Sequence, residues 1–290
     1  MTTLQQDGNN SSGLLRLSLN AKICVAATVL VVLSLAVTAT VIGIKSSASA
    51  ESAAIELTRT TAREVAGILK SRISVNLAAV MGMSETMRST KSADLALQRE
   101  QINEVVKGTL AASGDLAGAS VTWEPGALDG KDAEFAGHKP LYDDTGRFMP
   151  YWSRNSAGVI RVEPIVFGPK PGDNDWYDVP KRVGKVFFTE PYEYPIDGKQ
   201  VLVTSLAAPI MIGGVFQGAS VGDLPLSHLT KILSEQKRMA GGKLSLISNG
   251  GMYASHPSAE LLGKKMADIP AAGLERVRQG QAFEYEDAQG

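Results

Sequence analysis

The 290-residue chain is long enough for one large domain or two small ones, and its charges nearly cancel, with 29 basic and 30 acidic side chains. A chain without a strong positive field does not gather nucleic acid, so nucleic acid is excluded as a partner. The only cysteine, Cys24, lies in an apolar run near the N-terminus. The rest of the chain therefore has neither a disulfide nor a thiolate zinc site.

Residues 23–44 form an unbroken run of 22 residues without a charge, proline, asparagine or glutamine. A helix of this length spans about 33 Å, enough to cross a hydrocarbon core of about 30 Å. A cleaved signal with small residues at 48–50 is the alternative, but its apolar core is usually about 7–15 residues. Arg16 and Lys22 precede the run, which favours a cytoplasmic tail at residues 1–22 and a domain in the periplasm. The sequence thus predicts an inner-membrane anchor.

Residues 45–113 follow as a helical stalk. Apolar side chains recur three or four residues apart, which predicts a long helix over 46–87, a break at 91–94 and a second helix over 95–112. The long helix either packs against its counterpart in a homodimer or lies on its own sheet, and the pattern fits both. Four apolar residues are the candidate dimer contacts: Leu69, Ile73, Leu77 and Val80.

Residues 114–240 have a different period. Five short runs are rich in β-branched or aromatic residues: 119–123, 159–162, 186–189, 201–206 and 215–221. Turn signals such as Asp197-Gly198 separate them, and a helical pattern returns over 226–233. These features predict an α+β module with an antiparallel sheet built largely from hairpins.

Residues 241–290 begin a second, smaller α+β module. We expect strands at 243–248 and from residue 252, a helix over 267–279 and a last strand at 282–286. The sequence ends just after that strand, so we expect this module to be truncated and to continue beyond Gly290.

Catalytic chemistry is hard to find in this sequence. The three histidines are widely spaced, no glycine-rich loop matches a phosphate cradle, and no serine lies in a nucleophile elbow. We therefore expect a protein that is not an enzyme and that holds neither a cofactor nor a metal.

Aromatic residues are instead concentrated between residues 142 and 194. This stretch holds five tyrosines and two tryptophans, interleaved with arginines and aspartates. Aromatic rings with a few fixed charges commonly hold a small planar or cationic molecule. The alternative is that these rings only pack a loop-rich sheet.

Several segments of this region match a known family. They are TGRFMPYWSR (145–154), VEP (162–164), DWYDVPKR (175–182), TEPY (189–192) and GASVGDLPL (218–226). With the membrane helix and long helix before them, they resemble a double Cache domain. This is the periplasmic sensor of many bacterial methyl-accepting chemotaxis receptors, and of some sensor kinases and diguanylate cyclases. The resemblance covers residues 45–290. It implies two PAS-like modules against one long helix, with the ligand in the membrane-distal module and none in the second.

The resemblance also implies a ligand site. Amino-acid-binding members place an arginine two residues before a Trp-Tyr pair, followed by a tyrosine and an aspartate that hold the amino group. The matching positions here are Asn174, Trp176, Tyr177, Tyr192 and Asp223. Because asparagine lacks the charge and the fork of a guanidinium, an α-carboxylate is a poor fit.

Arg147 and Trp152 complete the candidate site, in segments that resemble the purine-sensing branch. A purine offers a flat ring and N–H edges, and an amine offers a cation. We rank a purine derivative before an amine and an amine before an amino acid. The expected function is a homodimeric chemotaxis sensor that signals across the membrane to proteins bound by a region beyond this sequence. The alternatives are the sensor front of a histidine kinase or a diguanylate cyclase, and an anchored domain that binds a partner.

Overall fold

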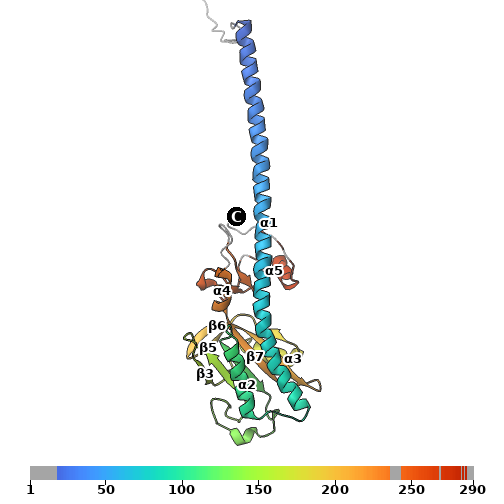
Figure 1. Ribbon diagram of the computed structural model, residues 1–290, viewed down its shortest axis with the longest axis vertical. Helices are drawn as coiled ribbons and strands as arrows, with labels where there is room; N and C mark the ends of the chain where they lie inside the picture. The colour runs from blue at the N-terminus through green and yellow to red at the C-terminus, as the bar shows by residue number, and fades with distance from the viewer. Residues whose placement is uncertain (1–17, 236–242, 268, 282, 284, 286–290) are drawn as a thin grey trace, which may run out of the picture. The chain divides into compact units, whose positions relative to one another are not determined.

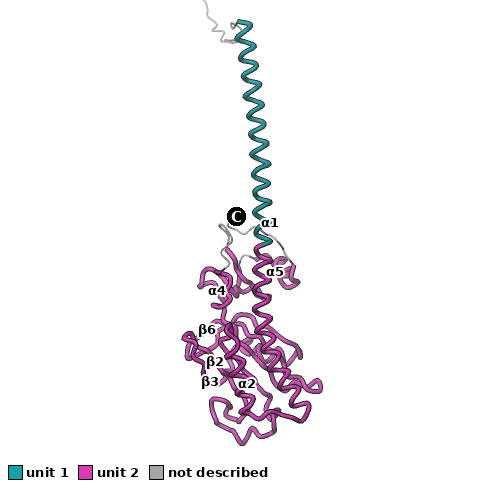
Figure 2. Tube along the Cα trace, in the orientation of Figure 1, with its two compact units in different colours: residues 1–60 teal, residues 61–290 magenta. Residues whose placement is uncertain are grey.

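The computed structural model describes residues 18–235, 243–267, 269–281, 283 and 285. The chain forms two units, Met1–Thr60 and Thr61–Gly290 (Figure 2). Helix α1 (Leu19–Ser92) begins in the first unit and continues into the second. It contains a stretch long and apolar enough to cross a membrane, and the side chains of that stretch are not buried. Most of the expected N-terminal tail lies outside the described residues.

Helix α1 is continuous from the apolar run through the stalk and ends five residues later than the sequence predicts. The second stalk helix is α2 (Arg99–Ala112). Its start is fixed by a capping box in which the side chains of Gln98 and Gln101 bind each other's backbone N–H groups. Both helices belong, over residues 61–112, to the second unit.

The second unit is built on an antiparallel sheet in the order β3-β2-β1-β7-β6-β4, with β5 also paired to β6 (Figure 1). The strands are β1 (Gly118–Trp123), β2 (Tyr151–Arg154), β3 (Ile160–Glu163), β4 (Phe187–Phe188), β5 (Tyr192–Ile196), β6 (Lys199–Ile212) and β7 (Val215–Pro225). The long β6–β7 hairpin and β1 form its centre. A short 3-10 helix, η2 (Asp132–Phe135), lies between β1 and β2.

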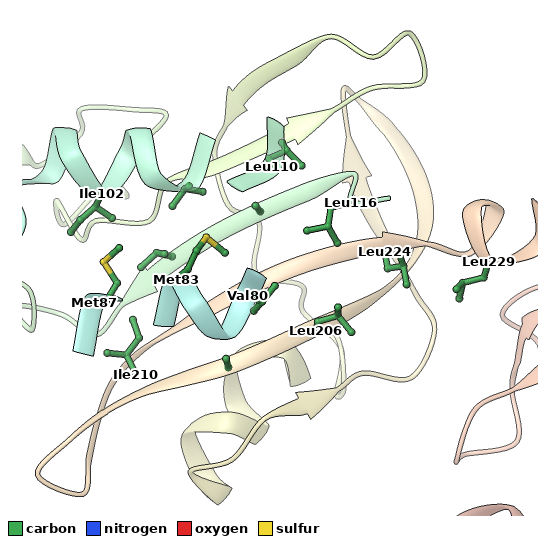
Figure 3. Close-up of a cluster of buried hydrophobic side chains, with 14 of the residues drawn as sticks. Val80, Met83, Met87, Ile102, Leu110, Leu116, Leu206, Ile210, Leu224 and Leu229 are labelled. Atoms are coloured by element: carbon green, nitrogen blue, oxygen red, sulfur yellow. The ribbon is translucent and has the colours of Figure 1, made fainter. Parts of the chain in front are cut away.

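One face of this sheet packs against α1 and α2. Val80, Met83 and Met87 of α1 pack in one buried cluster with Leu206 and Ile210 of β6 (Figure 3). Burial of each such side chain contributes about 1.5–3 kcal/mol, so this layer holds the C-terminal part of α1, around residues 80–87, against the sheet.

This packing decides between the two readings of the stalk face. Leu69 and Val80 are buried in the unit's own core, and Ile73 and Leu77 pack against that core. The side chains named as candidate dimer contacts therefore belong to the core of their own chain, so this face of the helix is already covered.

The opposite face of the sheet carries helix α3 (Asp175–Val183), which the sequence analysis did not predict. Pro180 lies inside it, and the helix ends at Gly184, whose φ of +64° suits glycine. Trp176 and Tyr177 pack from this helix onto Ala207, Ala219 and other small side chains of the sheet. Its aspartates and proline are turn-forming residues, so this segment carries no clear helical pattern in the sequence.

The remaining elements of the described residues are α4 (Leu226–Glu235), within residues 114–240, and β8 (Leu246–Ile247), β9 (Tyr253–Ser255), η3 (Ala259–Leu261) and α5 (Ala271–Arg278), within residues 241–290. Helix α4 follows the prediction, whereas β8 and α5 are shorter than expected. Residues 236–242, which follow α4, and most of the last expected strand, 282–286, lie outside the described residues.

Candidate functional site

Three residues of the central strands lie directly opposite one another on the α3 side of the sheet. Gly118 of β1 pairs with Asp223 of β7, and Asp223 pairs with Ser205 of β6. A Cβ atom at position 118 would lie 2.4 Å from Tyr151 Oη and 2.6 Å from Asp223 Oδ2. Glycine at position 118 thus leaves room for a hydroxyl and a carboxylate side by side.

Asp223 is the chemical centre of this row. Its side chain is 4% exposed, and Ser205 Oγ donates to Asp223 Oδ1 at 2.6 Å. The same Ser205 hydroxyl lies 2.7 Å from Tyr192 Oη. Burial raises the pKa of Asp223 above its ordinary value, and the hydrogen bonds from Ser205 and Tyr151 only partly oppose this effect. A carboxylate in this environment favours a ligand that brings donors or a positive charge.

A small cavity opens over Asp223. It is lined by Ser120, Tyr151, Ile165, Trp176, Tyr192, Tyr194, Val221 and Asp223. Its volume of about 10 Å³ leaves room for about one water molecule. None of these lining residues is a lysine, arginine or histidine. Burial, followed by the charge of Asp223, raises the pKa values of Tyr151 and Tyr192, so both phenols stay protonated.

The indole N–H of Trp176 is buried on the cavity wall and has no hydrogen-bond partner among the described residues. The hydroxyl of Tyr151 lies beside the Asp223 carboxylate, next to Gly118. A buried donor left unpaired costs about 1–3 kcal/mol, so the Trp176 N–H favours a ligand atom or a water that accepts from it. The cavity therefore combines an acceptor, Asp223, with an unused donor, Trp176.

Residues 164–174, between β3 and α3, contribute Ile165 to the cavity wall; we call this segment the cover loop. Ile165 lines the cavity, and the Val166 N–H donates to Tyr194 Oη at 3.1 Å. The ring of Phe167 lies 5.2 Å from that of Trp176. Asn174 turns back onto this loop and binds the backbone of Gly168. Its amide is thus used within the protein and does not face a ligand carboxylate.

The six residues nominated from the sequence divide into two groups. Trp176, Tyr192 and Asp223 come together in the cavity. Arg147, Trp152 and Tyr177 are not among its lining residues, and their role in ligand binding stays a prediction.

Arg147 and Tyr177 belong to a hydrogen-bonded network beside α3. Arg147 donates to the Tyr177 hydroxyl, which donates to Glu124, and Lys181 Nζ lies 2.8 Å from Glu124 Oε1. Burial acts to raise the pKa of Glu124, but the hydrogen bonds from Lys181 and Tyr177 outweigh it, so this pKa lies below its usual value. The network fixes the outer face of α3.

Trp152 lies on the other face of the sheet. Its indole N–H donates to Asn103 Oδ1 of α2 at 2.9 Å, and the ammonium of Lys107 lies 5.0 Å from its ring centre. Its neighbour Tyr151 faces the cavity instead, because successive strand residues point to opposite faces. Tyr151, Tyr194 and Ser205 were missed. Strand alternation along the predicted run 201–206 is the signal that could have found Ser205, whereas Tyr151 and Tyr194 lie on short strands that the sequence did not predict.

A second cavity, of about 410 Å³, lies where the β2–β3 and β5–β6 turns approach the start of α4. Two of its charged residues are already engaged: Arg154 binds the carbonyl oxygens of Leu110 and Ser113 at the end of α2, and Asp197 binds Arg161. This cavity is larger, but it holds no buried carboxylate and no unpaired buried donor. The chemistry is concentrated at Asp223.

Comparisons with known proteins identify this architecture. Residues 102–231 match the family model of the methyl-accepting chemotaxis protein-like first PDC sensor domain. The extracellular domain of mmHK1S-Z3, named as a histidine kinase, is 32% identical with a TM-score of 0.61, and the match covers 73% of this chain and 74% of that one. The chain belongs to the double Cache sensor family.

Two further proteins show the kind of receptor that carries such a sensor. The methyl-accepting chemotaxis protein TlpQ of Pseudomonas aeruginosa is 34% identical over 184 residues, which is 58% of this chain. The structure of methyl-accepting chemotaxis protein X is 27% identical with a TM-score of 0.64, covering 77% of this chain and 81% of that one. This double Cache sensor is thus similar to the periplasmic sensor domains of chemoreceptors, which are not enzymes. The chain spans 26% of the length of TlpQ.

Proposed function

We propose that this double Cache sensor detects a small nitrogenous molecule in the periplasm and signals its presence across the inner membrane. The apolar stretch of α1 supports a membrane anchor, because its length and composition suit a single span. The similarity to chemoreceptors supports chemotaxis as the response. The similarity to the mmHK1S-Z3 domain supports a second candidate, in which the same sensor controls a histidine kinase.

The observation that carries the ligand class is the buried carboxylate of Asp223. It accepts a hydrogen bond from Ser205, and none of the residues that line the cavity around it is cationic. A buried charge without a partner is costly, so a ligand that supplies N–H donors to Asp223 gains binding free energy. An α-amino acid would add a carboxylate with no guanidinium to receive it, since Asn174 is bound to Gly168.

A purine derivative uses this site more completely than a simple amine. A purine has N–H groups for Asp223 and ring nitrogens that accept from the unpaired indole N–H of Trp176. Its flat ring also matches walls made of Trp176, Tyr192 and Tyr194. An amine supplies a charge for Asp223 but leaves the Trp176 N–H unpaired. We therefore place purines first and amines second.

Ligand entry requires the cover loop to move. The cavity has room for about one water, so a purine or an amine fits only after residues 164–174 shift outward. A ligand that stabilises one position of this loop over the other shifts the equilibrium between two states of the module. A 100-fold preference supplies about 2.7 kcal/mol, enough for a graded signal.

We include a homodimer in the proposal, with contacts on the outer side of α1. Val75 is 70% exposed and Met81 is 46% exposed, although both lie in the part of α1 that packs on the sheet. Exposed apolar side chains along a helix are suited to packing against a second copy of that helix. The buried face formed by Leu69 and Val80 is not available for this contact.

Thermal unfolding of the purified chain in detergent tests the ligand class. Adenine and guanine, ethanolamine, and leucine are added separately; a ligand at 100 times its Kd adds about 2.7 kcal/mol, a shift of several degrees in Tm. We expect a shift with a purine that is lost in Asp223→Ala and Trp176→Ala and kept in the control Asp178→Ala. A shift with ethanolamine alone would favour the amine class. A shift with leucine alone would refute the proposal, and no shift would favour a domain that binds a protein partner.

A further inference from the structure

Glu190 joins the ligand-binding module to the module that follows it. It lies between β4 and β5, and its carboxylate accepts hydrogen bonds from two residues of the β8–β9 turn. The N–H of Gly250 donates to Glu190 Oε1 at 2.8 Å, and the hydroxyl of Ser248 donates to Glu190 Oε2. Both carboxylate oxygens are thus occupied by the second module.

The turn held by Glu190 is well defined. The N–H of Gly251 donates to the Ser248 carbonyl oxygen at 2.9 Å, and the N–H of Met252 donates to Ser248 Oγ at 2.9 Å. A Cβ atom at Gly250 would lie 2.7 Å from the carboxyl carbon of Glu190. The carboxylate therefore fits closely against this turn, and a displacement of one requires a displacement of the other.

The residue before Glu190 is tied to the ligand site. Thr189 Oγ1 accepts from the N–H of Ser205 at 2.8 Å, and the Thr189 N–H donates to the Ser205 carbonyl oxygen at 3.1 Å. Thr189 is 7% exposed and Ser205 is fully buried. Ser205 is also the residue whose hydroxyl binds Asp223. Direct hydrogen bonds thus connect Asp223 to Ser205 and Ser205 to Thr189, the neighbour of Glu190.

We propose that Glu190 is a positioning residue that transmits the state of Asp223 to the β8–β9 turn of the second module. The proposal rests on the proposed function, because it takes Asp223 as the group that meets the ligand. When a ligand donates a hydrogen bond to the Asp223 carboxylate, the charge-assisted hydrogen bond from Ser205 weakens. The backbone of β6 around Ser205 then shifts. Thr189 is bonded to that segment, so Glu190 and the turn that it holds adjust with it.

Hydrogen exchange in the ligand-free chain tests this connection. Asp223→Asn removes the charge that a ligand would neutralise and keeps the side-chain shape. We expect it to change the exchange rate of amides 248–252 by about threefold or more, through altered local opening. We expect the same substitution to have no effect on these amides in a Glu190→Ala background.

A matched control is Glu163→Ala. Glu163 also binds a backbone N–H of a turn, that of Asp197 at 3.0 Å, but has no contact with residues 248–252 among the hydrogen bonds of the described residues. In this background Asp223→Asn should still alter exchange at 248–252. The proposal is overturned if Asp223→Asn leaves these amides unchanged, or if it changes them equally with and without Glu190. Because no ligand is added, these outcomes are independent of whether a purine binds.

Discussion

The side-chain amide of Asn174 forms hydrogen bonds with both the N–H and the carbonyl oxygen of Gly168. The Gly168 N–H donates to Asn174 Oδ1 and Asn174 Nδ2 donates to the Gly168 carbonyl oxygen, each at 2.9 Å. This pair of hydrogen bonds closes the cover loop just before α3 begins. An arginine could not make the same paired contact, because a guanidinium has donors but no acceptor.

Asn174→Ala should therefore loosen the cover loop without disturbing the sheet. Loss of both hydrogen bonds should lower the free energy of unfolding by about 1–2 kcal/mol and speed amide exchange over residues 164–174. Hydrogen exchange followed by mass spectrometry measures this change. Asn155→Ala is the control, since Asn155 accepts two backbone N–H groups in the remote β2–β3 turn. Unchanged exchange at 164–174 in Asn174→Ala would show that Asn174 does not hold the loop.

Asp223→Asn should stabilise the ligand-free protein at neutral pH. Because burial raises the native pKa of Asp223, the folded protein binds more protons than the unfolded chain between the ordinary pKa and the raised one. The unfolding free energy of the parent thus falls as pH rises through this window, whereas the neutral amide is unaffected.

Thermal unfolding from about pH 4 to pH 8 measures the difference. The advantage of Asp223→Asn should be largest at the upper end and should shrink as the parent carboxyl becomes protonated. Each kcal/mol corresponds to about 2–4 °C in Tm. The exposed Asp178→Asn should show no such trend. An advantage for Asp223→Asn that grows toward low pH would have the wrong sign and would contradict the account of Asp223.

Gly118→Ala and Gly108→Ala form a matched pair. At Gly118 the new methyl group would lie 2.4 Å from Tyr151 Oη and 2.6 Å from Asp223 Oδ2, whereas at Gly108 nothing lies within 4 Å. We expect Gly118→Ala to destabilise the fold by about 1–3 kcal/mol and to abolish ligand binding. Gly108→Ala, in the middle of α2, should stabilise by about 0.5–1 kcal/mol. Denaturant unfolding of the two variants checks both signs, and a neutral Gly118→Ala would show that the row has spare room.

Arg99→Lys should be costly although the charge is kept. The Arg99 guanidinium is 4% exposed, forks onto Asp129 and Asp132 at 2.6 and 2.8 Å, and lies 4.4 Å from the centre of the Phe135 ring. A lysine cannot make this forked, stacked contact, so we expect a loss of about 2–4 kcal/mol. The exposed pair of Arg161 with Asp197 provides the comparison: Arg161→Lys should cost less than about 1 kcal/mol. Equal losses of unfolding free energy in Arg99→Lys and Arg161→Lys, measured by denaturant unfolding, would show that the buried Arg99 cluster is no more stabilising than the exposed pair.

The elements that the sequence predicted well are those with a long, clear period. The runs that became β1, β6 and β7 are rich in β-branched residues and are bounded by turn signals, and α4 repeats leucine and isoleucine at helical spacing. The short strands β2 and β5 were missed because four or five residues with two aromatic rings do not establish a period. Helix α3 was missed because Asp175 and Pro180 are common in turns, and its packing onto the sheet overrides that preference.

The candidate site followed the same division. Asp223 and Tyr192 were found through the family resemblance, whereas Tyr151 was passed over for its neighbour Trp152. That choice depends on which side of the sheet each side chain faces, and the face is set by the pairing of Tyr151 with Ser120 of β1. Register of this kind belongs to the assembled sheet and cannot be read from a strand of four residues.

Successive residues of one central strand face two different parts of the molecule. On β7, Asp223 faces the cavity, while Gly222 and Leu224 face the core beneath α1; a Cβ atom at Gly222 would lie 2.7 Å from Val80 Cγ2. On β7 the odd-numbered positions therefore shape the cavity, and the even-numbered positions hold α1 against the sheet. Substitutions confined to the odd positions of this strand would alter the cavity without loosening the long helix from the sheet.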